Sequence, residues 1–152
     1  MIELENTNMA KLVELIDSIK NLRFIIQAHF KKQLKNNELG ITVEMLEVLM
    51  VLARTNQINQ KEIADRVRKN KANLTPIIHK LSLKELLLRE EDPNDRRSNI
   101  ITLTEKGQKL CRLYDKQFEE FYAKFLQDVD VKNLNKTIGV LKDIGQQVVK
   151  LD

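Results

Sequence analysis

Cysteine, proline and glycine are scarce in this 152-residue chain, which has one, two and four of them. A single cysteine excludes an internal disulfide and suits a reducing compartment, so we expect a cytoplasmic protein. Few glycines and prolines, together with long periodic apolar runs, predict a mainly helical fold. No apolar run reaches the roughly 18 residues of a membrane helix. The acidic start, Met1–Asn6, lacks the pattern of a signal peptide.

The motifs of catalysis and cofactor binding are also missing. The chain has no Gly-rich phosphate loop, nucleophile elbow or metal motif. His29 and His79 are far apart in sequence, and neither has metal-ligand spacing with Cys111. Cys111 lies in an apolar stretch and is expected to be a small buried thiol. We therefore expect no enzyme activity, no metal and no cofactor.

The positive charge is concentrated in one segment of the chain. The net charge is +4. Residues 54–97 carry 11 Lys and Arg against 7 Asp and Glu, whereas residues 1–53 carry 6 against 7 and residues 98–152 carry 9 against 8. An excess of cations in one segment is expected where a protein contacts phosphates, although a solvated charged face gives the same count.

Within that segment, residues 58–81 read as two short amphipathic helices. Asn59 and Glu62 have the spacing of a capping box at the start of the first helix. Its apolar face carries Ile63 and Val67, and the second helix repeats the pattern with Leu74, Ile78 and Leu81. The turn between them, residues 68–71, is basic. This order predicts a helix-turn-helix, whose second helix enters the major groove of DNA.

A strand, a charged loop and a second strand follow. The expected strands are Leu86–Leu88 and Asn99–Leu103, and the loop between them contains the turn residues Pro93 and Asn94. Asp95 lies two residues from Arg97 and can hold its guanidinium in one pose. A held guanidinium loses less entropy on binding in a narrow minor groove. The whole pattern predicts a winged helix-turn-helix.

At the wing the chain resembles the MarR family of bacterial transcription regulators. The family's D-P-x-D-R-R wing is matched by residues 92–97, and its L-T-x-x-G motif by residues 103–107. The L-T-x-[KQ]-E-[IL]-A pattern of the preceding helix is matched by residues 58–64. The resemblance implies a single MarR-like domain over residues 1–152, with a winged DNA-binding lobe at 41–107 and dimerisation helices at 8–36 and 108–152.

The resemblance also implies the function and the residues that carry it. The protein is expected to be a homodimeric repressor that occludes pseudo-palindromic promoter DNA. Arg97 would enter the minor groove with Asp95 as its brace, and residues 71–76 would form the reading end of the recognition helix. The expected DNA-binding set is Lys69, Lys71, Ala72, Asn73, Thr75, Pro76, Lys80, Asp95, Arg96 and Arg97.

Three positions depart from the family pattern. Arg68 and Glu85 stand where the family often has glycine. A non-glycine residue with positive φ costs about 1 kcal/mol, so we expect these junctions to close differently. Pro76 would cost about 3 kcal/mol inside a helix. We therefore expect the second helix to start late, with Asn73 as its N-cap, or to have a distorted first turn.

The flanking segments are periodic and strongly apolar. Thr42, Thr104 and Asp130 are expected to cap the helices that follow them, and the helix after Thr104 is expected to reach about Asp128. Terminal helices this apolar are best explained by packing on a second subunit. By the resemblance, a small aromatic effector would bind near the dimerisation helices. The candidate lining residues, which could equally be core, are Phe24, Phe30, Tyr114, Phe118 and Tyr122.

A second class of function remains open. A winged helix can also serve as a protein–protein interaction module without specific DNA binding. Such a module is expected to lose the basic excess and the braced wing arginine, and this chain keeps both. A membrane-surface helix is disfavoured because the positive charge lies on a turn and a wing rather than along one helix face.

Overall fold

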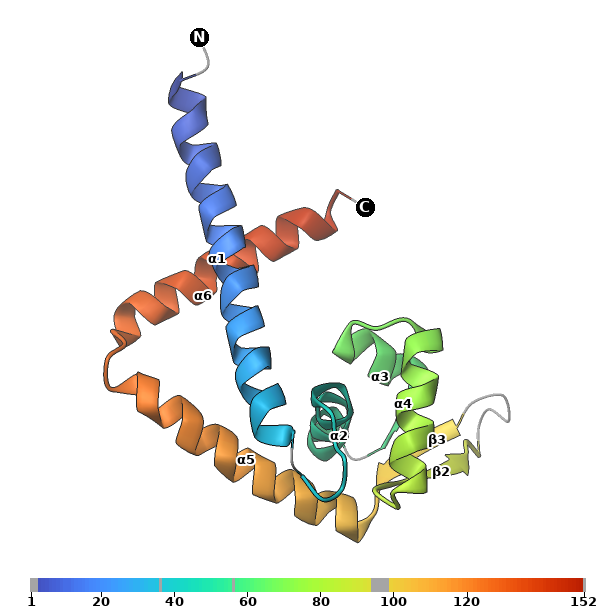
Figure 1. Ribbon diagram of the computed structural model, residues 1–152. Helices are drawn as coiled ribbons and strands as arrows, with labels where there is room; N and C mark the ends of the chain where they lie inside the picture. Colours follow the sequence, from blue (N-terminus) through green and yellow to red (C-terminus); the bar gives the residue numbers. More distant parts are fainter. Residues whose placement is uncertain (1–2, 36, 56, 94–98, 152) are drawn as a thin grey trace. The chain divides into compact units, whose positions relative to one another are not determined.

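The computed structural model describes residues 3–35, 37–55, 57–93 and 99–151 (Figure 1). The described residues form six α-helices and a small sheet, which confirms the expected mainly helical class with a β wing. The chain divides into two compact units, Met1–Cys111 and Arg112–Asp152. The elements are α1 (Glu3–Leu34), α2 (Val43–Thr55), β1 (Ile58–Asn59), α3 (Gln60–Val67), α4 (Lys71–Leu83), β2 (Leu87–Glu91), β3 (Asn99–Leu103), α5 (Glu105–Leu126) and α6 (Val131–Val149).

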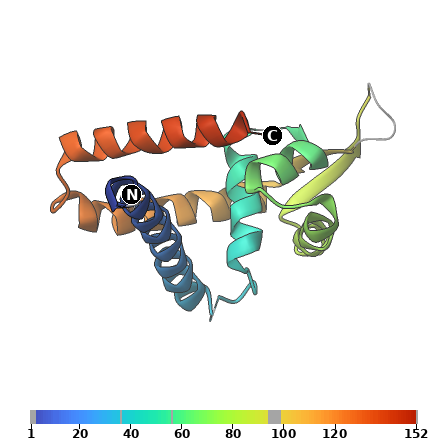
Figure 2. The same ribbon diagram turned by 90° about the horizontal axis from the view of Figure 1, so that it is seen from above.

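The core of the first unit is built around α2. This helix contacts α1, α3, α4 and β3, and Figure 2 shows it between the end of α1 and the α3–α4 pair. The expected cap is present, because Thr42 Oγ1 accepts from the Met45 N–H at 3.3 Å. Six apolar side chains of this helix are buried, namely Met45, Leu46, Val48, Leu49, Met50 and Leu52. These apolar contacts make α2 the support for α3 and α4.

The sheet has three antiparallel strands in the order β1-β3-β2. The expected hairpin is present, with Leu87 opposite Leu103 and Glu91 opposite Asn99. Its first strand begins at Leu87 rather than at Leu86. The sequence did not predict β1, whose two residues pair with Ile100 and Ile101 of β3. This pairing ties the start of α3 to the middle of β3.

The long terminal helices differ slightly from their expected bounds. Helix α1 covers Glu3–Leu34 instead of residues 8–36, and α5 ends at Leu126 instead of about Asp128. Asp130 caps α6 as expected, because its carboxylate accepts from the Lys132 N–H at 2.8 Å. Among the residues described, no helix combines the length and the apolar character needed to cross a bilayer.

Candidate nucleic-acid interface

Helix α3 begins with the capping box that the sequence predicts. The Asn59 side chain accepts from the Glu62 N–H at 2.9 Å, and the Glu62 carboxylate accepts from the Asn59 N–H at 2.9 Å. Both helix-end donors are therefore satisfied without water. Ile63 is fully buried on the inner face. The start of α3 is fixed by residues three apart in sequence.

The turn between α3 and α4 closes in a left-handed conformation despite the absence of glycine. Arg68 has φ 52° and ψ 45°. The N–H groups of Arg68 and Lys69 donate to the carbonyls of Asp65 and Ala64, as in a Schellman motif. Glu85 has φ 58° and closes α4 in the same way. The expectation that both junctions would close differently is wrong, because the paired backbone bonds outweigh a strain of about 1 kcal/mol.

Lys69 of this turn is held by an ion pair. Its Nζ lies 3.5 Å from Glu47 Oε2 of α2, and the two side chains retain 23% and 34% of their exposure. The pair therefore lies partly out of solvent and ties the turn to α2. Lys69 was expected to contact DNA, and a phosphate would have to compete with Glu47 for it.

Helix α4 starts earlier than the sequence analysis favoured. Asn70 is its N-cap and accepts from the Asn73 N–H at 2.8 Å, so Asn73 lies within the helix. Pro76 is the sixth helical residue, beyond the first turn, and has no N–H to offer the carbonyl of Ala72. Ala72 and Pro76 are both exposed, so the missing hydrogen bond lies on the outer face of the helix. The early start also places Leu74 in the helix, where it is fully buried.

The two faces of α4 differ sharply in burial. Leu74, Ile78 and Leu81 have no exposed surface and pack on the lobe. The six predicted DNA-binding residues of this helix all lie exposed on its remaining surface, namely Lys71, Ala72, Asn73, Thr75, Pro76 and Lys80. A helix of this kind is anchored by one face and free to enter a groove with the other.

Two hydrogen bonds of the Thr75 hydroxyl, called the relay below, connect α3 with α4. The Thr75 hydroxyl donates to the Lys71 carbonyl at 2.8 Å and accepts from Gln60 Nε2 at 2.7 Å. The sequence analysis did not single out Gln60, because the two bonded residues are 15 positions apart and no local pattern connects them. The relay fixes the first residue of α3 against the reading end of α4.

The first turn of α5 holds the end of α4. Thr104 Oγ1 donates to the Glu85 carbonyl at 2.7 Å and accepts from the Gly107 N–H at 3.0 Å, which confirms the expected cap. Lys106 Nζ donates to the Lys84 carbonyl at 2.8 Å. A Cβ on Gly107 would lie 2.1 Å from the Leu86 carbonyl oxygen. These contacts give a physical reason for the L-T-x-x-G pattern, since only glycine permits this approach.

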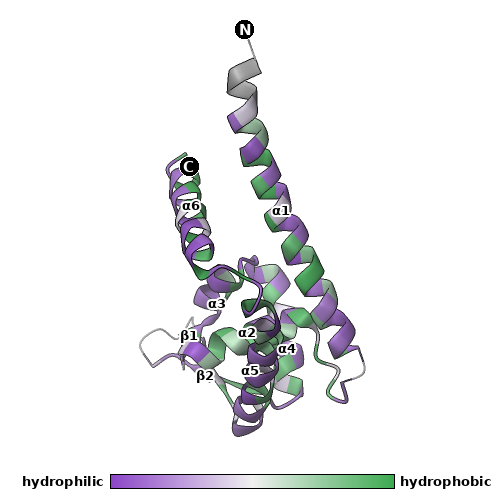
Figure 3. Cartoon of the chain, turned by 90° about the vertical axis from the view of Figure 1, so that its left-hand side faces the viewer, coloured by the Kyte–Doolittle hydropathy of each residue, from purple (hydrophilic) through white to green (hydrophobic). Residues whose placement is uncertain are grey.

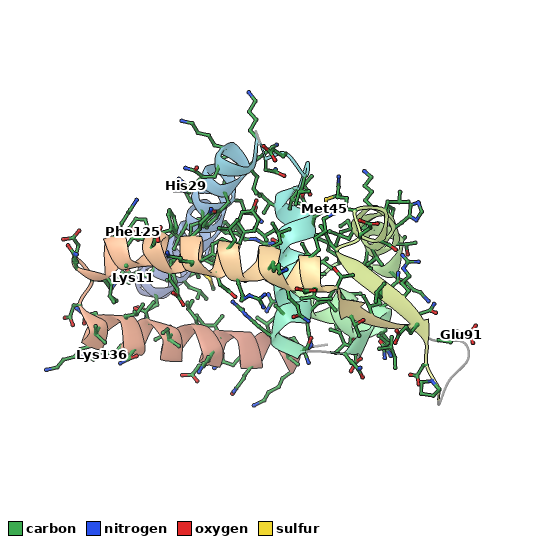
Figure 4. The ribbon with its side chains drawn as sticks, turned by 90° about the horizontal axis from the view of Figure 1, so that it is seen from below. Lys11, His29, Met45, Glu91, Phe125 and Lys136 are labelled. Atoms are coloured by element: carbon green, nitrogen blue, oxygen red, sulfur yellow. The ribbon has the colours of Figure 1, made fainter. Side chains whose placement is uncertain are left out.

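The tip of the wing lies outside the residues that the structure describes, and it contains Asp95, Arg96 and Arg97. The base of the wing is defined by the pairing of β2 with β3. Figure 4 shows Glu91 at the end of β2 farthest from α2, whereas Met45 lies on α2 among the side chains of the lobe. The expected minor-groove contact and its brace therefore remain sequence-based predictions.

Hydrogen bonds and nearby charges also affect the carboxyl group of Glu44 at the start of α2. A hydrogen bond to its own backbone and one from Thr42 lower the pKa of the Glu44 carboxyl, and the charges of Lys69 and Lys31 lower it further. The carboxylate form is therefore favoured at the helix N-terminus, as the helix dipole also favours it. In the described part of the chain, no three His, Cys, Asp or Glu side chains are grouped to hold a metal ion.

The candidate effector residues fall in both units. In α1, Phe24 is 70% exposed and Phe30 is half-buried. In α5, Tyr114 and Phe118 are half-buried, and Tyr122 is 52% exposed. Burial raises the pKa of the Tyr114 phenol above its ordinary value of 10.0. The assignment of these residues to one pocket stays a prediction.

Comparison with known proteins gives consistent matches. The profile of the MarR family matches residues 41–99. The transcriptional regulator SarZ of Staphylococcus epidermidis is 26% identical over 137 residues, which cover 78% of this chain and 93% of SarZ. A MarR transcriptional regulator from Methanosarcina mazei matches in structure with a TM-score of 0.75 and 26% identity, over 90% of this chain and 96% of that one.

A third match shares the fold at lower identity. FabT of Streptococcus pneumoniae, solved in complex with DNA, has a TM-score of 0.74 and 16% identity. The match covers 95% of this chain and 99% of FabT. The similarity therefore extends beyond the winged lobe to the long terminal helices.

Proposed function

Since this chain belongs to the MarR family of winged-helix transcriptional regulators, we propose that it binds promoter DNA sequence-specifically as a homodimer. The observation that carries the proposal is α4, whose inner face is fully buried while its reading end is exposed beside the lysines at 71 and 80. Several relatives and structural neighbours are described as transcriptional regulators or as DNA complexes. The chain is accordingly assigned no enzymatic activity.

In the proposed complex, cations fix the register and the recognition helix reads base edges. Lys71 and Lys80 contact phosphates, and Lys69 joins them if Glu47 releases it. Arg96 and Arg97 bring the wing to the minor groove, with Asp95 bracing Arg97. These roles are those predicted from the sequence, and for α4 they agree with the exposure of its predicted DNA-binding residues.

The proposed homodimer uses the terminal helices. Each of them carries large apolar residues on its exposed surface, visible in Figure 3 as green segments interleaved with purple. In α6 no residue is buried, and Val131, Leu134 and Ile138 are each at least 40% exposed. Such surfaces are unfavourable in water and favour packing on a second copy. A two-fold dimer would place its recognition helices about 34 Å apart, in successive major grooves.

We further propose that the dimer represses transcription by occluding a promoter, in the cytoplasm of a bacterial cell. A small aromatic compound would release it from DNA by binding near Phe24, Phe30, Tyr114, Phe118 and Tyr122. The support for this step is the family resemblance and the partial exposure of these rings. A protein–protein interaction module is the alternative, and it predicts no sequence preference on DNA.

The proposal is tested by fluorescence anisotropy with DNA from the region upstream of the protein's own gene. The same DNA with a scrambled sequence is the control, at two salt concentrations. We expect tighter binding to the native sequence and a steep fall in affinity with salt, because phosphate contacts release counterions. Equal, weak binding to both DNAs would overturn the proposal and favour the interaction module.

Variants separate the proposed contacts. Arg97→Ala should weaken binding by about 1–3 kcal/mol and relax specificity at one position. Lys80→Gln should weaken binding to all sequences and reduce the salt slope by about 0.9, the value for one phosphate. Lys136→Gln is the matched control, since this exposed lysine lies on α6 and projects from it into solvent (Figure 4).

A further inference from the structure

We propose that α4 reads thymine methyl groups through an apolar cluster, which consists of the methyl groups of Ala72 and Thr75 and the ring of Pro76. This inference rests on the proposed DNA binding and specifies its sequence class. It predicts that each half-site contains A·T pairs whose thymine methyls face the helix in the major groove.

The apolar cluster occupies one exposed area of α4. Its three residues are spaced i, i+3 and i+4, which makes them neighbours on a helix surface. All three are exposed, and Ala72 and Pro76 lie on the side of α4 away from the buried Leu74 and Ile78. Ala72 and Pro76 carry no donor or acceptor in their side chains. The centre of the reading surface therefore offers DNA apolar contact.

Thr75 adds a methyl group because its hydroxyl is already engaged. A hydroxyl has one donor and two acceptor positions. The donor is used on the Lys71 carbonyl at 2.8 Å, and one acceptor position is used by Gln60 Nε2 at 2.7 Å. One acceptor position and the methyl group remain for a ligand. Because two partners hold the hydroxyl, the methyl is fixed before DNA arrives, and less rotamer freedom is lost on binding.

Charge and chemistry around the cluster favour DNA as the occupant. Lys71 precedes the cluster, Lys80 follows it one turn after Pro76, and both are exposed. The thymine C5-methyl is the one methyl group that the four bases present in the major groove. Asn73, exposed beside the cluster, has the amide that pairs with adenine N6 and N7. Together these residues match the two members of an A·T pair.

The test begins with selection of binding sites from a random double-stranded DNA library by the full chain. In the selected duplex, each thymine of a half-site is then replaced singly by deoxyuridine, which keeps base pairing and removes only the methyl. We expect at least one replacement per half-site to weaken binding roughly fourfold, the value of one buried methyl. The same replacement outside the half-sites is the control.

Two variants separate the methyl of Thr75 from its hydroxyl. Thr75→Ser keeps the relay and removes the methyl, so it should bind the thymine duplex more weakly and lose the deoxyuridine effect at one position. Thr75→Val keeps a methyl there and should retain that effect. Unfolding curves show that each variant is folded.

The outcomes distinguish this inference from the proposed function. A selected site that tolerates every deoxyuridine replacement within about twofold would overturn the inference while the proposed function stands. A deoxyuridine effect that is unchanged at every position in Thr75→Ser would remove Thr75 from the cluster. Failure of the library to enrich any sequence would instead overturn the proposed function itself.

Discussion

Replacing Gly107 by alanine should destabilise the lobe through a single added carbon. In the native chain the Cβ would lie 2.1 Å from the Leu86 carbonyl oxygen and 3.2 Å from Leu103 Cδ2. The first turn of α5 must therefore move roughly 1 Å away from Leu86. That carbonyl also accepts from the Thr104 N–H at 3.2 Å, and Thr104 bonds Glu85 at 2.7 Å. The shift strains both hydrogen bonds.

The expected magnitude follows from three contributions. Overpacking costs about 1–3 kcal/mol, and weakened hydrogen bonds cost about 1 kcal/mol each. Alanine in place of a helical glycine returns about 1 kcal/mol. We therefore expect a net loss of about 2–4 kcal/mol in the free energy of unfolding. The measurement is urea denaturation followed by circular dichroism, at a fixed protein concentration because the proposed dimerisation would contribute to stability.

Gly139→Ala is the matched control for this variant. Gly139 is also helical, but a Cβ there would meet no atom within 4 Å. Its neighbours three and four positions away are polar (Asn135, Lys136, Lys142 and Asp143). We expect this variant to gain up to about 1 kcal/mol. Equal stability changes in the two variants would refute the account of Gly107, since both add the same atom to a helix.

Three further predictions concern backbone strain, pH and charge. Glu85→Gly should gain about 1 kcal/mol in unfolding free energy because φ is 58° at this residue, whereas Glu85→Ala should not. An equal gain in both variants would contradict backbone strain at Glu85. The pKa of Glu44 is lowered in the folded state, so its contribution to stability is present above the unfolded value of 4.5 and is lost as the pH falls through the lower folded value. Over that pH window the urea midpoint of Glu44→Gln should therefore fall less than that of the native chain. An identical dependence of the two midpoints on pH would count against this role of Glu44. Glu47→Gln should free Lys69 from its ion pair and so raise the affinity for DNA. In anisotropy titrations the slope of affinity against salt concentration should steepen by about 0.9. An unchanged slope would mean that Lys69 makes no phosphate contact.

The sequence predicted the features that depend on neighbours three or four residues away. The capping box of Asn59 and Glu62 and the caps at Thr42, Thr104 and Asp130 are all present. These interactions are local, so their spacing in the sequence is nearly their whole geometry. The amphipathic faces of α3 and α4 were predicted for the same reason.

The features that the sequence did not predict depend on residues far apart in the chain or on competition between two possible helix caps. Strand β1 is only two residues long and pairs with residues more than 40 positions later, so periodicity carries no signal for it. The Gln60–Thr75 bond crosses between two helices. For α4, both Asn70 and Asn73 can cap a helix, and the cost of Pro76 favoured the later start. In the structure the earlier start places Leu74 in the helix, where it is fully buried, and Pro76 lies on the exposed face.

The central claim, that this chain is a two-fold DNA-binding regulator, is tested most directly by hydroxyl-radical footprinting over the region upstream of its own gene. The account predicts two protected segments whose centres lie about one helical turn, roughly 10 base pairs, apart on one face of the duplex. It also predicts that protection spreads to the flanking minor grooves and that this flanking part is lost in Arg97→Ala. A single protected segment would contradict the dimer, and uniform cleavage at saturating protein would contradict DNA recognition itself.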